Sequence, residues 1–196
     1  MKLGVLFSGG KDSSYALFKT MQKNKVVCLI SVISENEESY MFHTPIDKVG
    51  EQARKIRLPL VKVKTKGEKE KELNDLKKAI KIAIEKYKIE GVITGAVESV
   101  YQASRVQKIC NELDVYCFNP LWKMDQVELL KEIVKKDFKV KIVKVAADGL
   151  DEKWINRILD NKAINELIKL RDKYGISVSG EGGEMETEVI YFPSLK

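Results

Sequence analysis

Short apolar runs recur along the first part of the chain, and each is followed by a segment whose apolar residues lie at helical spacing. The runs at 3–7, 26–33, 91–95 and 115–119 are nearly continuous, which is typical of strands buried on both faces of a parallel sheet. Residues 60–65 alternate instead and predict a half-exposed strand. This strand–helix repeat predicts an α/β fold, a doubly wound and mostly parallel sheet with helices on both faces.

The pattern changes after Trp122. A helix is predicted to follow an N-cap at Asp125, and further elements are an alternating strand at 140–145, a helix at 163–174 and a terminal strand at 189–192. Because this part lacks the strand–helix repeat, it predicts a small C-terminal α+β lobe. We therefore expect two units, residues 1–123 and residues 124–196.

A glycine-rich turn directly follows the first apolar run and precedes a helical pattern. It reads Ser8-Gly9-Gly10-Lys11-Asp12-Ser13, and we call residues 8–13 the phosphate loop. Glycines let the backbone approach an anion, and the following helix directs free N–H groups and its positive dipole end toward it. Lys11 adds a cation, Ser8 and Ser13 add hydroxyls, and Asp12 is a predicted magnesium ligand. The alternative is a plain strand-to-helix connection.

Composition narrows the class of protein. The chain has 196 residues and a net charge of +6, with lysines interleaved among acids. A basic face for nucleic acid or an acidic protein is one interpretation, and a surface of ion pairs, as in thermophile proteins, is the one we favour. The three cysteines form no C-x-x-C pair, which favours reduced thiols in the cytoplasm. We expect neither a signal peptide nor a membrane span.

Further candidate ligands follow the other predicted strands. Gly95 ends the strand at 91–95, where a close backbone approach would be useful, and Tyr101, Gln102 and Arg105 lie near the start of the next helix. Arg105 suits a phosphate or carboxylate, but pairing with a surface acid is an equal alternative. His43 is the only histidine; a surface role is its default, although the expected pocket lies beside it.

A second unusual stretch lies near the C-terminus. Residues 179–188, which we call the glycine–glutamate stretch, contain three glycines and four glutamates. Composition alone favours a flexible acidic turn before the terminal strand. Clustered carboxylates at a glycine turn also suit binding of ammonium or magnesium, or orientation of a substrate hydroxyl.

The phosphate loop resembles the Ser-Gly-Gly-x-Asp-Ser loop of the ATP pyrophosphatases, which cleave ATP between the α and β phosphates. Gly180-Glu181-Gly182-Gly183-Glu184-Met185-Glu186-Thr187 is more specific. Together with Thr94-Gly95-Ala96, Tyr101-Gln102-x-x-Arg105, Pro120-Leu121-Trp122 and Asp148-Gly149-Leu150-Asp151, it resembles the diphthine–ammonia ligases within that group. The resemblance covers nearly the whole chain.

This resemblance implies amidation of diphthine, a modified histidine of translation elongation factor two, to diphthamide. ATP and ammonia are consumed, an adenylated carboxylate forms, and AMP and pyrophosphate are released. Residues 1–123 would then bind ATP with magnesium, and residues 124–196 the substrate. Adenine would be recognised by side chains or by the backbone near Ile33. The implied catalytic residues are Lys11, Asp12, Ser13, Glu181, Glu184 and Glu186.

Two other functions stay open. One is an ATP pyrophosphatase with a different substrate, such as a tRNA thiolase, but the cysteines are predicted to be buried and arginines are few. The other is a nucleotide sensor of the universal-stress type, which would bind ATP without releasing pyrophosphate. Nucleic acid is a disfavoured partner, and the sequence leaves a homodimer open.

Overall fold

The computed structural model describes residues 1–34, 46–68 and 70–194. Its larger sheet has five parallel strands in the order β3-β2-β1-β4-β5, which confirms the predicted doubly wound sheet. The strands are β1 (Lys2–Leu6), β2 (Lys25–Ser34), β3 (Leu60–Thr65), β4 (Gly91–Ile93) and β5 (Tyr116–Phe118).

Helices cover both faces of this sheet. One face packs on α1 (Lys11–Met21) and α2 (Ile46–Ile56), and the other on α3 (Glu72–Tyr87) and α4 (Val100–Glu112). Strand β2 shows why: Leu29 faces the first pair of helices, whereas Cys28 and Ile30 face the second. The chain leaves β1 toward β2 and later returns beside β1 as β4. The strand order therefore reverses at β1, which is where open α/β sheets bind ligands.

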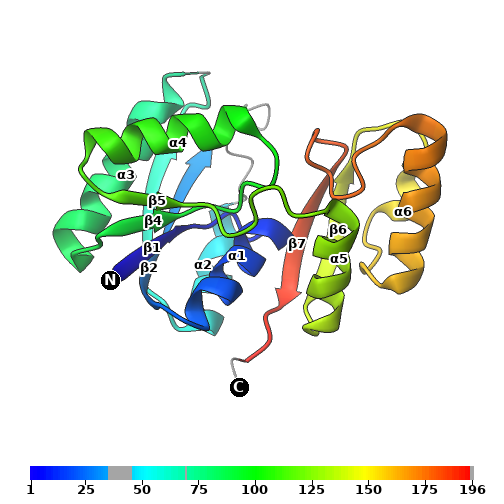
Figure 1. Cartoon of the computed structure of the whole chain (residues 1–196), viewed down its shortest axis with the longest axis horizontal. Helices are drawn as coiled ribbons and strands as arrows, with labels where there is room; N and C mark the ends of the chain where they lie inside the picture. The colour runs from blue at the N-terminus through cyan, green and yellow to red at the C-terminus, as the bar shows by residue number, and fades with distance from the viewer. Residues whose placement is uncertain (35–45, 69, 195–196) are drawn as a thin grey trace.

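The second part of the chain forms a two-stranded antiparallel sheet with two helices. Strand β6 (Lys139–Val145) pairs with β7 (Met185–Tyr191), and α5 (Gln126–Lys135), the short helix η1 (Glu152–Trp154) and α6 (Asn161–Tyr174) surround them. Figure 1 shows β7 lying between α1 and β6, and α1 contacts β7 directly. Strand β7 therefore packs the smaller sheet against α1.

Strand β7 begins earlier than the sequence pattern predicts, at Met185 rather than 189. Two of its glutamates lie opposite lysines of β6 in the register: Glu186 opposite Lys144 and Glu188 opposite Lys141. These pairs form cross-strand ion pairs at 3.3 and 3.2 Å. Neutralisation by the partner strand explains why an acidic segment is a strand rather than a flexible turn.

One apolar core runs through both parts. The rings of Phe18 in α1, Phe138 before β6 and Phe192 after β7 lie 5.1–6.1 Å apart in edge-on pairs. Helix α5 adds Leu129, Leu130 and Ile133, all fully buried in the same cluster. The boundary between 123 and 124 stays a prediction, but the shared core holds the two parts together. None of the helices in the described ranges is long and apolar enough to cross a membrane.

Candidate active site

The phosphate loop connects β1 to α1 and is folded on its own hydroxyl groups. The hydroxyl of Ser13 donates to the carbonyl of Gly10 at 3.2 Å, accepts from the N–H of Ser8 at 3.2 Å and contacts Ser8 Oγ at 3.1 Å. Gly9 has a φ of +79°, which favours glycine, and the N-cap residue Gly10 has no side chain to cap the helix. Because the N–H of Lys11 donates to Thr187 Oγ1, the anion site predicted at the start of α1 depends on the N–H groups that follow Lys11.

Lys11 and Asp12 form a largely buried ion pair at the start of α1. Lys11 Nζ lies 2.7 Å from Asp12 Oδ2, and the Lys11 side chain is only 4% exposed. The other carboxylate oxygen, Asp12 Oδ1, is buried without a hydrogen-bond partner in the structure. Because an orphaned carboxylate oxygen beside a phosphate site is a suitable cation ligand, Asp12 fits the predicted magnesium.

The end of the chain holds the phosphate loop from one side. The N–H of Val189 donates to the carbonyl of Gly9 at 2.9 Å, and the N–H of Lys11 donates to Thr187 Oγ1 at 3.2 Å. Gln52 of α2 joins them, because its Nε2 donates to the carbonyls of Gly9 at 3.1 Å and Val189 at 2.7 Å. Gln52 was not predicted as a site residue, and Thr187 was predicted only as part of the glycine–glutamate stretch, because no local pattern indicates contacts 43 and 176 residues away.

A cavity of about 530 Å³ opens above the phosphate loop, at the carboxyl ends of β1, β2 and β4. We call it the front cavity. Three segments far apart in sequence line it: the phosphate loop, the segment after β4 with the start of α4, and the glycine–glutamate stretch. The cavity brings together eight of the predicted site residues: Ser8, Asp12, Ser13, Gly95, Tyr101, Gln102, Glu181 and Glu186. Gly9, Gly10 and Lys11 of the phosphate loop do not line it.

Gly95 permits the close packing of the phosphate loop on the segment after β4. A Cβ atom at this position would lie 2.8 Å from the backbone N of Ser13 and 2.9 Å from the backbone C of Asp12. These are backbone atoms at the start of α1, which cannot rotate away as a flexible side chain can. The glycine is therefore needed for the shape of the loop, in addition to lining the cavity.

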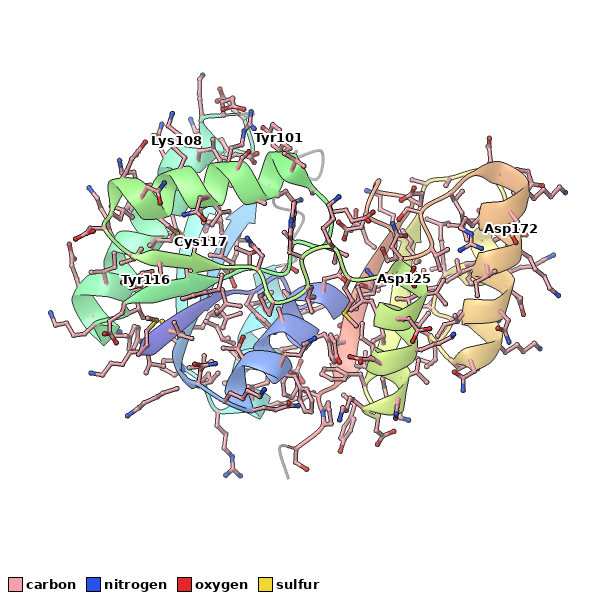
Figure 2. All side chains as sticks on the ribbon, in the orientation of Figure 1. Tyr101, Lys108, Tyr116, Cys117, Asp125 and Asp172 are labelled. Carbon is pink, nitrogen blue, oxygen red and sulfur yellow. The ribbon has the colours of Figure 1, made fainter. Side chains whose placement is uncertain are left out.

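Tyr101 and Arg105 of α4 meet Glu70 outside the larger sheet. Arg105 donates from Nε and Nη2 to Glu70 Oε1 at 2.9 and 2.7 Å, the Tyr101 hydroxyl donates to the same oxygen at 2.9 Å, and the Arg105 guanidinium stacks on the Tyr101 ring at 3.4 Å. Tyr101 lies at the end of α4 nearer the second sheet (Figure 2) and lines the cavity; Arg105 does not line it. Arg105 is thus paired with a surface acid, which was the alternative to binding a phosphate.

The three glutamates predicted to be catalytic have different surroundings. Glu181 lines the front cavity and accepts from the N–H of Glu98 at 3.2 Å. Glu186 also lines the cavity while paired to Lys144. Glu184 accepts from the N–H groups of residues 177 and 182 at 2.9 and 2.8 Å, and it does not line the front cavity. Its contacts stabilise the turn that presents Glu181.

Glu181 lies in an unusual electrostatic environment for a carboxylate. Burial raises the pKa of its carboxyl above the ordinary value of 4.5, and the nearby charge of Asp12 raises it further. The ammonium of Lys11 and the N–H of Glu98 oppose this effect. Asp12 and Glu181 both line the front cavity, so the two ends of the chain meet at one site.

The remaining predicted residues lie outside the front cavity or outside the described ranges. Ile33 is buried in β2, and residues 30–32 rather than Ile33 line the cavity. His43 lies outside the residues that the structure describes. Within the described ranges, histidine, cysteine and acidic side chains form no group of three or more that would hold a metal. Burial raises the pKa of the Cys28 thiol to about 12, which makes it a poor nucleophile.

Known proteins match the whole length of this chain. Residues 1–117 match the model of the diphthamide synthase N-terminal domain, and residues 125–196 match that of the C-terminal domain. The chain is 36% identical to a diphthine–ammonia ligase of Homo sapiens, with 100% of this chain and 81% of the relative covered. It is 32% identical to a diphthine–ammonia ligase of Saccharomyces cerevisiae, with 98% of this chain and 33% of the longer relative covered.

A solved structure shares the fold at low sequence identity. A protein of Methanocaldococcus jannaschii, described as a predicted subunit of a tRNA methyltransferase, aligns with a TM-score of 0.50 and 16% identity over 99% of this chain and 98% of that one. This likeness concerns the fold alone. The family rests on the two domain models and the curated relatives, and they show that this chain belongs to the diphthamide synthase family.

Proposed function

We propose that this protein is an ATP-dependent ligase that converts diphthine on translation elongation factor two to diphthamide with ammonia. One observation carries the proposal: the glycine–glutamate stretch faces the phosphate loop across a single cavity. The relatives named diphthine–ammonia ligase, which align over the whole chain, support the same substrate. The specific reaction is thus assigned from the family, and the chemistry from the site.

The chemistry starts from a carboxylate that ammonia cannot attack productively, because oxide is a very poor leaving group. A carboxylate oxygen of diphthine attacks the α-phosphorus of ATP, the bond between the α and β phosphates breaks, and pyrophosphate leaves. The ammonia nitrogen then attacks the carbonyl carbon, AMP leaves with the oxygen, and the nitrogen loses a proton. ATP, diphthine and ammonia give AMP, pyrophosphate and diphthamide.

The phosphate loop supplies the charge stabilisation for the first step. The Ser8 and Ser13 hydroxyls line the front cavity and would face the departing phosphates, together with N–H groups at the start of α1. Lys11 does not line this cavity; its buried ammonium, paired with Asp12, would add positive charge close to the phosphates. Asp12 would hold magnesium through its orphaned oxygen, and this ion would neutralise phosphate charge when bound. Closely spaced donors on a rigid helix position ATP, so orientation contributes much of the rate.

Glu181 is our candidate for binding the nitrogen source. An ammonium ion needs an acceptor when it enters and must lose a proton before its nitrogen attacks. Glu181 faces the phosphate loop, and its raised pKa makes it a better proton acceptor than an ordinary glutamate. Glu186, at the same cavity, would orient the substrate. No covalent enzyme intermediate is required.

The two alternatives predict different behaviour. A tRNA thiolase needs a reactive cysteine. Cys28 and Cys110 are buried, and burial raises the pKa of the Cys28 thiol. Cys117, in contrast, is partly exposed, which corrects the prediction that all three are buried, and its hydrogen bond with Cys110 lowers the pKa of its thiol. The match to the diphthamide synthase domain models, rather than the cysteines, therefore disfavours the thiolase. A nucleotide sensor would bind ATP and release no pyrophosphate. The cytoplasmic location, the thermophilic origin and a homodimer stay predictions of the sequence.

The test is incubation with ATP, magnesium, isotopically labelled ammonium and elongation factor two that carries diphthine. We expect the label in the modified histidine by mass spectrometry, with AMP and pyrophosphate formed in equal amounts. Glutamine in place of ammonium is the control for the nitrogen source. Pyrophosphate release without any label in the elongation factor would contradict the assigned substrate, and no pyrophosphate release would contradict the ligase.

A further inference from the structure

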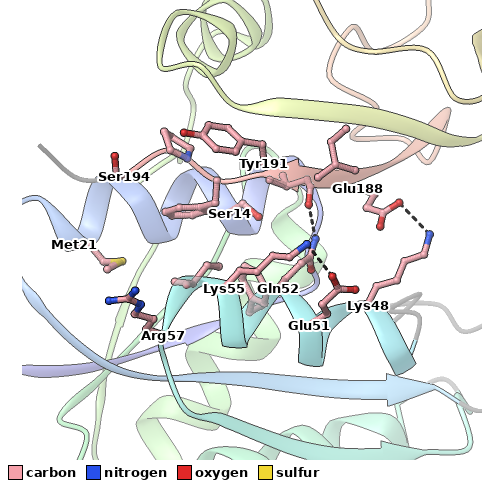
Figure 3. Close-up of a pocket in the computed structure, with 16 residues that line it drawn as sticks. Ser14, Met21, Lys48, Glu51, Gln52, Lys55, Arg57, Glu188, Tyr191 and Ser194 are labelled. Atoms are coloured by element: carbon pink, nitrogen blue, oxygen red, sulfur yellow. Dashed lines mark hydrogen bonds and ion pairs between the residues drawn. The ribbon is translucent and has the colours of Figure 1, made fainter.

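A second cavity, of about 610 Å³, lies behind the phosphate loop. We call it the rear cavity. Helices α1 and α2, strand β7 and the segment up to Ser194 line it, as Figure 3 shows. Phe7 is the only described residue that lines both the front and the rear cavity. The rear cavity is therefore a separate site, which the proposed reaction does not use.

The interior of the rear cavity contains polar groups that lack partners. Ser14 lines it, is fully buried, and its Oγ has no hydrogen-bond partner in the structure. Gln52 also lines it; its Nε2 bonds two backbone carbonyls, while its Oε1 is buried without a partner. Buried polar atoms without partners are uncommon, because each costs desolvation free energy. A ligand that carries an N–H or O–H donor would satisfy them.

The cations that line the rear cavity differ in their partners. Lys48 pairs with Glu188 at 2.9 Å, and Lys55 pairs with Glu51 at 2.8 Å (Figure 3). Arg57, directly after α2, lines the same cavity and makes no ion pair with any described residue. Its guanidinium presents a planar fork of donors that suits a carboxylate or a phosphate.

Apolar side chains line the part of the rear cavity between Gln52 and Arg57. They come from α1, α2 and the end of the chain: Met21, Ile56, Val189 and Phe192. Gln52 lies in α2 and Arg57 directly follows this helix, five positions later. At the helical rise per residue, five positions correspond to about 7.5 Å along the axis of α2. This is enough for a small apolar body between a donor and an anionic group, and the volume lies in the range of small-molecule sites.

We propose that the rear cavity binds a small amphipathic anion, with an N–H or O–H donor at Ser14 and Gln52, an apolar body against Met21 and Phe192, and a carboxylate or phosphate at Arg57. The consequence is regulation of the front cavity. Gln52 donates to the carbonyl of Gly9 in the phosphate loop, so a ligand that contacts Gln52 also acts on the loop that binds ATP. Such coupling is reciprocal, and typical coupling between sites is about 5–150-fold in affinity.

Two probes distinguish the anionic group, and both carry a hydroxyl donor across an apolar ring from the anion: 4-hydroxyphenylacetate has a carboxylate and 4-hydroxyphenyl phosphate has a phosphate. 4-Hydroxyphenylacetamide is the uncharged control. We expect one of the two anions to bind the full-length protein in a calorimetric titration and to shift the amide NMR signals of Ser14 and Met21, and we expect the uncharged amide to bind about tenfold more weakly or worse.

Matched variants locate the anion. Arg57→Leu is expected to weaken the anionic probe about tenfold, while Arg54→Leu, an exposed arginine of α2 that does not line the cavity, leaves it unchanged. Equal binding by both variants would overturn the proposal, as would the absence of binding by either anion. Bound probe should also change the KM for ATP in pyrophosphate release, and an unchanged KM would overturn the regulatory part. None of these failures bears on the amidation reaction.

Discussion

Replacement of Gly95 by alanine tests how the larger sheet shapes the phosphate loop. The new methyl group would lie 2.8 Å from the backbone N of Ser13, 2.9 Å from the backbone C of Asp12 and 3.0 Å from Ser13 Cα. All three atoms belong to the first turn of α1. Relief of the clash therefore requires the loop and helix to move away from β4 together, and overpacking of this kind costs about 1–3 kcal/mol.

This free-energy cost should appear mainly as weaker ATP binding, because the displaced backbone atoms of Asp12 and Ser13 belong to the phosphate loop. If all of it is lost from binding, about 1–3 kcal/mol corresponds to a KM for ATP that is about 5- to 150-fold higher. Pyrophosphate release at varied ATP concentration measures this KM, and a thermal melt shows how much of the cost falls on folding instead.

Gly50→Ala is the matched control. Gly50 lies inside α2, and a Cβ atom there would have no neighbour within 4 Å. Alanine is favoured over glycine in a helix by about 0.5–1 kcal/mol, so this variant should melt at the same or a slightly higher temperature with an unchanged KM. A Gly95→Ala protein that behaves like Gly50→Ala in both assays would refute the steric role of Gly95.

Three further variants test the polar contacts of the site. Thr187→Val removes the acceptor of the Lys11 N–H at a cost of about 0.5–1.5 kcal/mol; we expect a several-fold higher KM for ATP, restored by Thr187→Ser, and an unchanged KM would contradict the contact. Asp12→Asn should raise the magnesium concentration needed for half-maximal pyrophosphate release, and an unaltered magnesium titration would remove Asp12 as a ligand. Glu181→Gln should lower amidation more than ATP binding. The folded protein raises the Glu181 pKa above the value of 4.5 in the unfolded chain, so the folded state binds the carboxyl proton more tightly. The free energy of unfolding therefore falls as the pH rises from about 4.5 through the raised pKa. The glutamine variant should therefore melt at a higher temperature than the parent at neutral pH and at a similar temperature at low pH; a lower melting temperature at neutral pH would contradict the raised pKa.

The sequence predicted the larger sheet well because local patterns determine it. Continuous apolar runs such as 26–33 indicate strands buried on both faces, and the strand–helix repeat leaves few topologies. The phosphate loop was equally accessible, since its glycines, hydroxyls and following helix are adjacent in the chain. These features need no knowledge of distant contacts.

Contacts between segments far apart in the chain could not be predicted from local sequence patterns. Strand β7 was expected to begin at 189, because the lysines of β6 that neutralise Glu186 and Glu188 are recognisable only once the two strands are paired. Gln52 was not singled out in the sequence, and Thr187 was recognised only as part of the glycine–glutamate stretch; the fold brings both to the phosphate loop.

The same reasoning applies to residues whose type was recognised but whose partner was not. Arg105 was considered both for a phosphate and for a surface acid, and only the structure pairs it with Glu70. Glu184 was grouped with Glu181 by sequence proximity, yet its oxygens bond backbone N–H groups of the turn. Residue type and spacing thus identified the acidic stretch. Only the fold shows that Glu181 faces the phosphate loop and that Glu184 stabilises the turn that carries Glu181.

The most direct test of the account follows the oxygen of the activated carboxylate. Elongation factor two is prepared with heavy oxygen in the diphthine carboxylate and incubated with this protein, ATP, magnesium and ammonium. Transfer of AMP to the carboxylate predicts that one heavy oxygen appears in AMP and none in pyrophosphate, as measured by mass spectrometry. Heavy oxygen in pyrophosphate, or AMP without it when diphthamide has formed, would contradict the adenylated intermediate and the arrangement of the site that we infer from it.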